Sequence, residues 1–165
     1  MGQNVDKILE VFYENPGKSF TVRELTKLTK VPRATLHKKL LDLKKQRLIT
    51  KENKAESNLL FEAKKINYFI EKVIDSGLMD ELIKNLNPSA IVLFGGIRKG
   101  ESDKESDIDL FVESSIEKEL DLSNFEKKLK HKIDLFVKPS IKNFHEGLFN
   151  NILNGIKLYG SIKIK

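Results

Sequence analysis

One short segment of the sequence places two aspartates in a pattern that suits metal-assisted chemistry. Residues 106–112 read Ser-Asp-Ile-Asp-Leu-Phe-Val, and this alternation of polar and aliphatic residues predicts a strand with Asp107 and Asp109 on one face. Side chains on the same face of a strand follow one another about every 7 Å. The segment therefore presents two neighbouring carboxylates, opposite a row of aliphatic side chains that face the core.

A third aspartate follows the same alternation. In residues 133–137 the aliphatic side chains lie on one face and Asp134 on the other, so Asp134 joins Asp107 and Asp109 if the two strands are neighbours over one core. Three carboxylates on one surface repel one another, and the arrangement is costly unless a cation neutralises it. Oxygen ligands with no His or Cys nearby predict Mg²⁺ or Mn²⁺ rather than zinc.

A buried strand and a glycine turn precede these aspartates. The continuous apolar run Ala90 to Phe94 ends at Gly95-Gly96, which predicts a strand buried on both faces and closed by a tight turn. Amides at the start of a helix are unpaired and carry positive partial charge, so the main chain at Gly95 and Gly96 can cradle triphosphate oxygens.

The glycine pair, a ten-residue spacer and Asp107-Ile108-Asp109 together resemble the signature of the polymerase-beta-like nucleotidyltransferases. The stretch Gly95 to Val112 is most similar to their minimal branch in prokaryotes, and the resemblance covers about residues 80–160. It implies a nucleotidyltransferase fold and transfer of a nucleoside monophosphate, with AMP expected, from a nucleoside triphosphate to a hydroxyl, with release of pyrophosphate.

The resemblance also implies roles for individual residues. Asp107 and Asp109 would hold the metal that bridges the triphosphate, and Asp134 would complete a second metal site and aid deprotonation of the attacking hydroxyl. The residues expected to bind the nucleotide are Gly95, Gly96, Lys99 and Ser106. The hydroxyl of Ser106 is equally suited to closing a turn.

The chain departs from the family at the glycine turn. Many relatives have Ser and then Arg after the first glycine, whereas this chain has Gly96 and Ile97, so a hydroxyl and a cation that bind phosphate are missing. Arg98 and Lys99 follow directly, and they either compensate for this loss or face solvent.

The first 64 residues predict three helices. Val5, Ile8, Leu9 and Phe12 give the first; the capping box Thr21-Val22-Arg23-Glu24 opens the second; and the third runs from about Pro32 to Gln46 over a stripe of Leu36, Leu40 and Leu43. Two short strands, Leu48-Ile49-Thr50 and Leu59-Leu60-Phe61, are then expected around a polar loop.

This order of elements resembles a winged helix-turn-helix domain, whose third helix enters the DNA major groove. The resemblance implies that Arg33, His37 and Lys38 approach bases or phosphates and that Lys51 and Lys54 contact phosphates from the wing. Residues 1–64 hold 14 Lys and Arg against 8 Asp and Glu, a net charge of +6, whereas the rest of the chain is neutral with 16 of each. Such a basic unit favours a DNA partner; a protein-docking module is the alternative.

Two helical pieces over residues 65–87 are expected to connect the halves, with an apolar stripe interrupted at Gly77. This stripe is either core or a subunit interface, and the second use predicts a homodimer. Further along, a helix is expected after Pro139, and residues 156–164 have a strand pattern.

Composition excludes several classes of protein. The 165 residues contain no cysteine, which excludes disulfides and thiolate metal sites, and only three scattered histidines, namely His37, His131 and His145. The longest apolar run is too short to span a bilayer, and the polar start has no signal-peptide core, so no membrane association and a cytoplasmic location are expected.

The sequence thus predicts an α+β protein. A winged helix-turn-helix domain (1–64) and a helical connector (65–87) precede a minimal nucleotidyltransferase domain (88–165) with a mixed sheet flanked by helices. Members of the resembled branch often adenylylate a protein partner of the HEPN ribonuclease-toxin type, which implies an antitoxin-like role. One alternative is a transcriptional regulator whose second half only senses a nucleotide; another is an enzyme that modifies a small alcohol.

Overall fold

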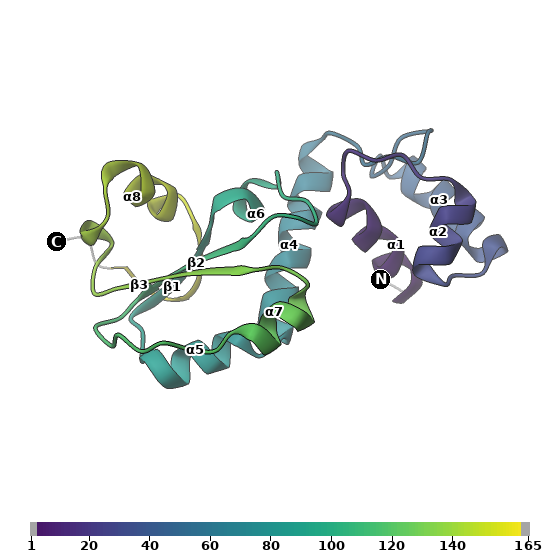
Figure 1. Ribbon diagram of the computed structural model, residues 1–165. Coiled ribbons are helices and arrows are strands. Elements are labelled where there is room, and N and C mark those ends of the chain that lie inside the picture. The colour runs from purple at the N-terminus through teal and green to yellow at the C-terminus, as the bar shows by residue number, and fades with distance from the viewer. Residues whose placement is uncertain (1–2, 163–165) are drawn as a thin grey trace. The chain divides into compact units, whose positions relative to one another are not determined.

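The computed structural model describes residues 3–162 and divides the chain into two compact units, Met1–Lys65 and Ile66–Lys165 (Figure 1). The long helix α4 (Leu59–Asp75) begins in the first unit and continues into the second. Each unit buries apolar side chains of its own.

Three helices form most of the first unit, as the sequence predicts: α1 (Gln3–Glu14), α2 (Val22–Thr29) and α3 (Arg33–Lys45). Both hydrogen bonds of the capping box are present, because Glu24 N donates to Thr21 Oγ1 at 3.2 Å and Thr21 N donates to Glu24 Oε2 at 2.8 Å. The predicted stripe of Leu36, Leu40 and Leu43 is buried.

The prediction of a second strand in the ribbon is wrong, because Leu59, Leu60 and Phe61 form the first turn of α4. Asn58 starts this helix, since its Oδ1 accepts the Phe61 amide at 2.9 Å. Leu59 is 82% exposed and Phe61 only 3%, and the buried positions Phe61, Phe69 and Val73 repeat at helical spacing. The short run of apolar residues concealed this period.

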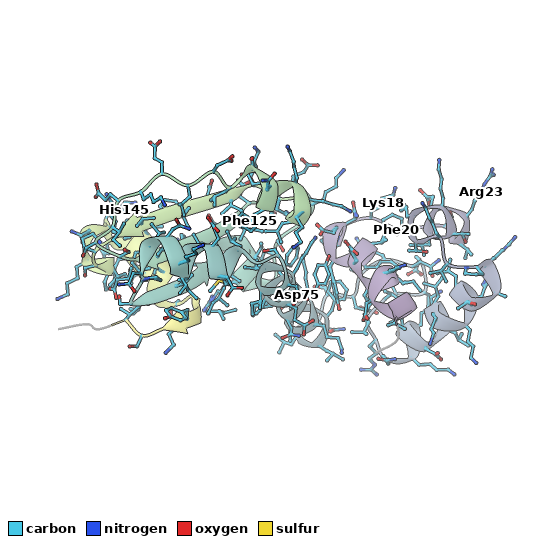
Figure 2. All side chains as sticks on the ribbon, turned by 90° about the horizontal axis from the view of Figure 1, so that it is seen from below. Lys18, Phe20, Arg23, Asp75, Phe125 and His145 are labelled. Atoms are coloured by element: carbon cyan, nitrogen blue, oxygen red, sulfur yellow. The ribbon has the colours of Figure 1, made fainter. Side chains whose placement is uncertain are left out.

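A small hairpin takes the place of the ribbon, with one bridge between Ile49 and Ala55. The Phe20 amide donates to the Asn53 carbonyl at 2.9 Å, and Asn53 Nδ2 donates to the Phe20 carbonyl at 3.0 Å. Phe20 is itself fixed, with its ring edge-on to Phe12 and the Lys18 ammonium 4.7 Å from its centroid (Figure 2). The hairpin that carries Lys51 and Lys54 is therefore tied to the segment between α1 and α2.

The second unit is built on a four-stranded mixed sheet in the order β3-β2-β1-β4. Its strands are β1 (Ala90–Phe94), β2 (Ile108–Glu113), β3 (Ile133–Lys138) and β4 (Ile156–Gly160). β1 is antiparallel to β2 and to β4, whereas β2 and β3 are parallel and are joined through α7 (Ser123–Leu129). The predicted mixed sheet is confirmed; of the predicted tail strand, residues 163 and 164 lie outside the described residues.

Helices cover both faces of this sheet (Figure 1). On one face α4, α5 (Leu78–Leu86) and α7 enclose a core with Leu110 and Val112 of β2. On the other face a short 3₁₀ turn, η1 (Ile141–Asn143), and α8 (Glu146–Leu153) cover Phe111. The two faces of β2 therefore belong to different cores.

The helical segment 65–87 packs within the second unit. Its apolar stripe contributes Phe69, Val73, Leu78, Leu82 and Leu86 to the core under the sheet, and all five are fully buried. These five positions are therefore core, and the homodimer stays a prediction. Within residues 3–162, no helix combines the length and the apolar character that a bilayer crossing requires.

Candidate active site

The glycine turn follows β1, as the sequence predicts. Gly95 begins the short helix α6 (Gly95–Lys99) with φ +72°, a left-handed conformation that glycine adopts without strain. Ile97 of this helix is completely buried and packs into the core with α4 and α5, which anchors the turn. The end of β1 is thus held at the end of the sheet where β2 and β3 begin.

Asp109 and Asp134 lie directly opposite each other at this end of the sheet. Phe94 pairs with Asp109 in the antiparallel register of β1 and β2, and Asp109 pairs with Asp134 in the parallel register of β2 and β3. Paired residues of neighbouring strands point to the same face. The predicted juxtaposition of these two acids is therefore confirmed, and it places them beside the end of β1.

Gly95 lies immediately beneath the carboxylate of Asp109. A Cβ atom added at Gly95 would lie 2.0 Å from Asp109 Oδ2 and 2.7 Å from Asp109 Cγ, whereas one added at Gly96 would meet nothing within 4 Å. The first glycine is therefore required by the acid that faces it, and the second opens onto free space.

Asp107 lies just outside the sheet, because β2 begins at Ile108 and not at Asp107 as the alternation predicts. Its side chain is exposed, while Asp109 is partly buried. On either side of Asp107, the Ser106 carbonyl lies 2.6 Å from His131 Nδ1, and the Ile108 amide donates to the Lys132 carbonyl at 2.8 Å. The segment that precedes β3 therefore holds both neighbours of Asp107.

The three aspartates, Asp107, Asp109 and Asp134, are close enough to interact electrostatically, and we refer to them as the site aspartates. Partial burial raises the pKa of Asp109 to about 6, with further contributions from the charges of Asp134 and Asp107. A carboxylate with such a raised pKa binds a proton or a cation more readily than an isolated one.

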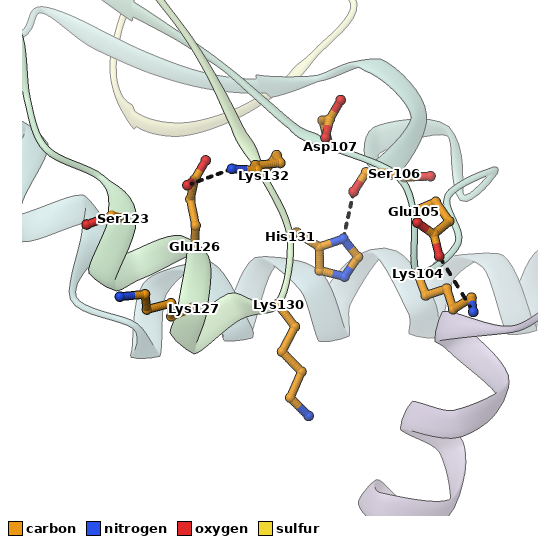
Figure 3. Close-up of a pocket in the computed structure, with 10 residues that line it drawn as sticks. All are labelled: Lys104, Glu105, Ser106, Asp107, Ser123, Glu126, Lys127, Lys130, His131 and Lys132. Carbon is orange, nitrogen blue, oxygen red and sulfur yellow. Dashed lines mark hydrogen bonds and ion pairs between the residues drawn. The ribbon is translucent and has the colours of Figure 1, made fainter.

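A shallow cavity of about 450 Å³ opens beside Asp107 (Figure 3). One face of α7 and the loop before β2 line it, and four lysines contribute to its wall: Lys104, Lys127, Lys130 and Lys132. Two of them are engaged locally, since Lys104 pairs with Glu105 at 3.5 Å and Lys132 with Glu126 at 3.4 Å. The imidazole of His131 also lines this cavity, on the side of the Ser106–Asp107 segment opposite the Asp107 carboxylate.

The donor chemistry of the site suits a hard divalent cation. Asp109 and Asp134 supply carboxylate oxygens from neighbouring strands. The pKa of Asp109 is raised by partial burial and then by the nearby carboxylates, whose charge a cation would neutralise. As the side chains stand, no group of three His, Cys, Asp or Glu residues within the described range 3–162 is arranged to hold a metal ion. Asp109 and Asp134 therefore offer two carboxylates that fit a cation. The exposed side chain of Asp107 would have to turn toward them to add a third, while its main chain stays in place.

The other predicted nucleotide-binding residues are placed less directly. Lys99 is exposed in the last turn of α6. The hydroxyl of Ser106 closes a turn, since it accepts the Asp103 amide at 2.9 Å and donates to Asp103 Oδ1 at 3.2 Å. For Ser106 the structure therefore shows the turn-closing alternative.

The residues predicted to bind DNA all lie in the first unit. Arg33, His37 and Lys38 are exposed along α3, and Lys51 and Lys54 are exposed on the small hairpin. The site aspartates belong to the second unit.

The nucleotidyltransferase domain family matches residues 75–159, from the end of α4 to β4 and slightly more than half of the chain. The chain belongs to the nucleotidyltransferase domain family. The matched range of this nucleotidyltransferase contains the glycine turn and all three site aspartates. No curated protein and no solved structure matches the chain.

Sequence reasoning on this nucleotidyltransferase missed His131 and Lys132. His131 counted only as one of three scattered histidines, although the residue is 5% exposed and its Nδ1 reaches the Ser106 carbonyl. No local pattern could have indicated this contact, because it joins residues 25 positions apart through the parallel pairing of β2 and β3.

The close approach at Gly95 predicts unequal effects for its two glycines. We expect Gly95→Ala to lower the free energy of unfolding by at least about 2 kcal/mol, because a methyl group would meet the Asp109 carboxylate and the left-handed backbone disfavours Ala. Urea unfolding followed by circular dichroism measures this. Gly96→Ala is the matched control and should be at least as stable as the parent, and equal losses in both variants would contradict the argument.

The raised pKa of Asp109 predicts that replacing this carboxylate by a neutral side chain stabilises the fold by an amount that depends on pH. Because the folded state holds the proton more tightly than the unfolded one, the stability contributed by this group falls as pH rises from about 4 to 6. Above pH 6, Asp109→Asn should therefore be more stable than the parent by about 1 kcal/mol, a value that allows for solvent screening of a partly buried group.

Below pH 4 the gain of Asp109→Asn should disappear, because the parent carboxylate is then protonated in both states. Thermal unfolding from pH 3.5 to 8 tests this, with the exposed Glu119→Gln as a charge-matched control. A gain that is constant over this range would show that Asp109 is not electrostatically strained.

Proposed function

We propose that the protein is a divalent-metal-dependent nucleotidyltransferase that moves a nucleoside monophosphate, with AMP expected, from a nucleoside triphosphate to a hydroxyl. The observation that carries this proposal is the direct pairing of Asp109 with Asp134 above the Gly95 turn, in a chain that belongs to the nucleotidyltransferase domain family. An acid pair crowded against a glycine turn is difficult to account for by stability alone, because its mutual repulsion destabilises the fold.

In this proposal the hydroxyl oxygen attacks the α-phosphorus, the bond to the β-phosphate oxygen breaks, and pyrophosphate leaves with the bonding electrons. Asp134 lies at the exposed edge strand, where an acceptor can approach, and it takes the hydroxyl proton. Asp107 and Asp109 would hold Mg²⁺ or Mn²⁺, with Asp134 as the third carboxylate. Such an ion neutralises charge that develops on the phosphate oxygens.

The glycine turn supports binding of the triphosphate. The open space beside Gly96 leaves that side of the turn free for a ligand, whereas the space beside Gly95 is filled by the Asp109 carboxylate. The family's Ser would fit at position 96 without a clash, so its absence removes a phosphate ligand and leaves the shape of the turn unchanged. Arg98 and Lys99, in the last turn of α6, are the cations available to offset this loss.

Transfer of label from α-labelled nucleoside triphosphates tests the activity. With Mg²⁺ and cell extract or the product of the neighbouring gene, we expect label on an acceptor, and a loss of at least about hundredfold in Asp109→Asn and Asp134→Asn. Glu119→Gln, an exposed acid outside the site, should retain activity. Equal labelling by all variants would assign the activity to a contaminant.

The acceptor is proposed from the resemblance to the minimal prokaryotic branch. A protein partner of the HEPN ribonuclease-toxin type fits that branch and would give an antitoxin-like role. The alternative function is a regulator that senses a nucleotide without turnover, which the missing phosphate ligands at Gly96 and Ile97 favour. Saturable nucleotide binding without any transfer of label would support this alternative.

The first unit is proposed to bind DNA. Arg33, His37 and Lys38 lie exposed along α3, and the hairpin with Lys51 and Lys54 is held by the exchange between Phe20 and Asn53. A positively charged helix beside a fixed basic hairpin can contact phosphates on both sides of a groove. The small hairpin would act where the ribbon of a winged helix acts.

Salt dependence tests this DNA interface. The logarithm of affinity should fall by about 0.9 per log unit of salt for each phosphate contacted, and Lys38→Ala should reduce the slope by about one contact. Lys7→Ala removes the same charge from α1 and should leave the slope unchanged. A response that is flat with salt would indicate a protein-docking module instead.

A further inference from the structure

His131 is a buried residue in the short connection between α7 and β3. The residue is 5% exposed, and its ring packs edge-on against Phe69 of α4, with ring centroids 5.3 Å apart. Nδ1 lies 2.6 Å from the carbonyl oxygen of Ser106 (Figure 3). Because a carbonyl oxygen only accepts hydrogen bonds, Nδ1 carries the proton and donates it to Ser106.

The next residue holds the other side of Asp107. Ile108 N donates to the carbonyl of Lys132 at 2.8 Å, so two consecutive residues bind the peptide groups before and after Asp107. Residues 103–105 are exposed and belong to a turn closed by Ser106 and Asp103. Asp107 thus lies outside the sheet, and the 131–132 segment fixes its main chain.

The same segment continues directly into the strand that carries Asp134. The Ile133 amide donates to Glu126 Oε1 at 3.1 Å, which ties the start of β3 to α7. His131, Lys132 and Ile133 therefore connect the position of Asp107 to that of Asp134 through one hydrogen-bonded stretch of chain. A shift of this stretch would move both acids relative to Asp109.

We propose that His131 is a positioning residue, which sets Asp107 against the other two site aspartates by donating from Nδ1 to the Ser106 carbonyl. The inference rests on the proposed function, since a fixed Asp107 matters most where it must complete a cation site. A buried imidazole needs a partner for its N–H in any role, so the hydrogen bond alone does not separate positioning of Asp107 from packing against Phe69. Donor and ring are separable by substitution.

Three substitutions separate these roles. His131→Asn places an amide donor near the position of Nδ1, whereas His131→Gln has its donor near the position of Nε2, out of reach of Ser106. His131→Phe keeps a ring beside Phe69 and removes the donor. If His131→Phe fails to fold, the Asn and Gln pair still decides, because both are amides of similar polarity.

Two measurements on the full chain are needed. The first is Mn²⁺ binding followed by electron paramagnetic resonance. We expect the dissociation constant to rise about tenfold in His131→Gln and His131→Phe and to stay within about threefold of the parent in His131→Asn, because removing a residue that orients a metal ligand costs roughly ten- to hundredfold in affinity.

The second measurement is amide hydrogen exchange of residues 103–108 in the metal-free protein. This exchange should accelerate about tenfold in His131→Gln and His131→Phe. Exchange in β1 should stay unchanged and is the internal control for global stability. His131→Gln that binds Mn²⁺ and exchanges like the parent would overturn the inference. An effect of His131→Asn as large as that of His131→Gln would also overturn it, by assigning the role to the ring.

The two proposals fail in distinguishable ways. The metal-dependent function is contradicted if the parent protein shows no saturable Mn²⁺ binding. It is also contradicted if the Asp109→Asn variant binds Mn²⁺ as tightly as the parent does. The exchange comparison needs no metal, and it then decides alone whether the His131 donor fixes the Asp107 segment. Asp109→Asn should leave exchange at 103–108 unchanged, because this variant keeps both hydrogen bonds that hold Asp107.

Discussion

Asp109 is held between a glycine main chain and a second carboxylate. Gly95 leaves no room for a Cβ atom beneath the Asp109 carboxylate, and Asp134 faces it from the adjoining strand. Gly95 and Asp134 both lie next to Asp109 because β1 ends at the same end of the sheet where β2 and β3 begin. The turn, the parallel pairing and the helix α7 that makes this pairing possible all serve to bring these groups together.

One face of the sheet packs into an aliphatic core, and the other face carries the site aspartates Asp109 and Asp134. Leu110 and Val112 face a core closed by α4, α5 and α7, which is filled with aliphatic side chains. On the opposite face Phe111 is fully buried under α8 and η1, while Asp109 of the same strand is only partly buried. The buried side chains of Leu110, Phe111 and Val112 thus hold β2 in place, and partial burial on this strand raises the pKa of Asp109.

Local patterns predicted most elements, because their periods are strong. The alternation in residues 133–137, the apolar run Ala90 to Phe94 and the capping box at Thr21 were each found as expected. The prediction was wrong at Leu59-Leu60-Phe61, where three apolar residues gave too short a window to distinguish a strand from a helix. Asn58 and the buried Phe61, Phe69 and Val73 decide for the helix.

The sequence by itself determined the acids, the glycine turn and the faces on which Asp109 and Asp134 lie, because the direction of a side chain in a strand depends only on its position. Tertiary structure alone decided that Asp134 is in register with Asp109, that Gly95 contacts Asp109, and that His131 binds Ser106. These contacts join residues from 14 to 25 positions apart, as the residue numbers show. Their formation depends on strand order and register, which no local pattern contains.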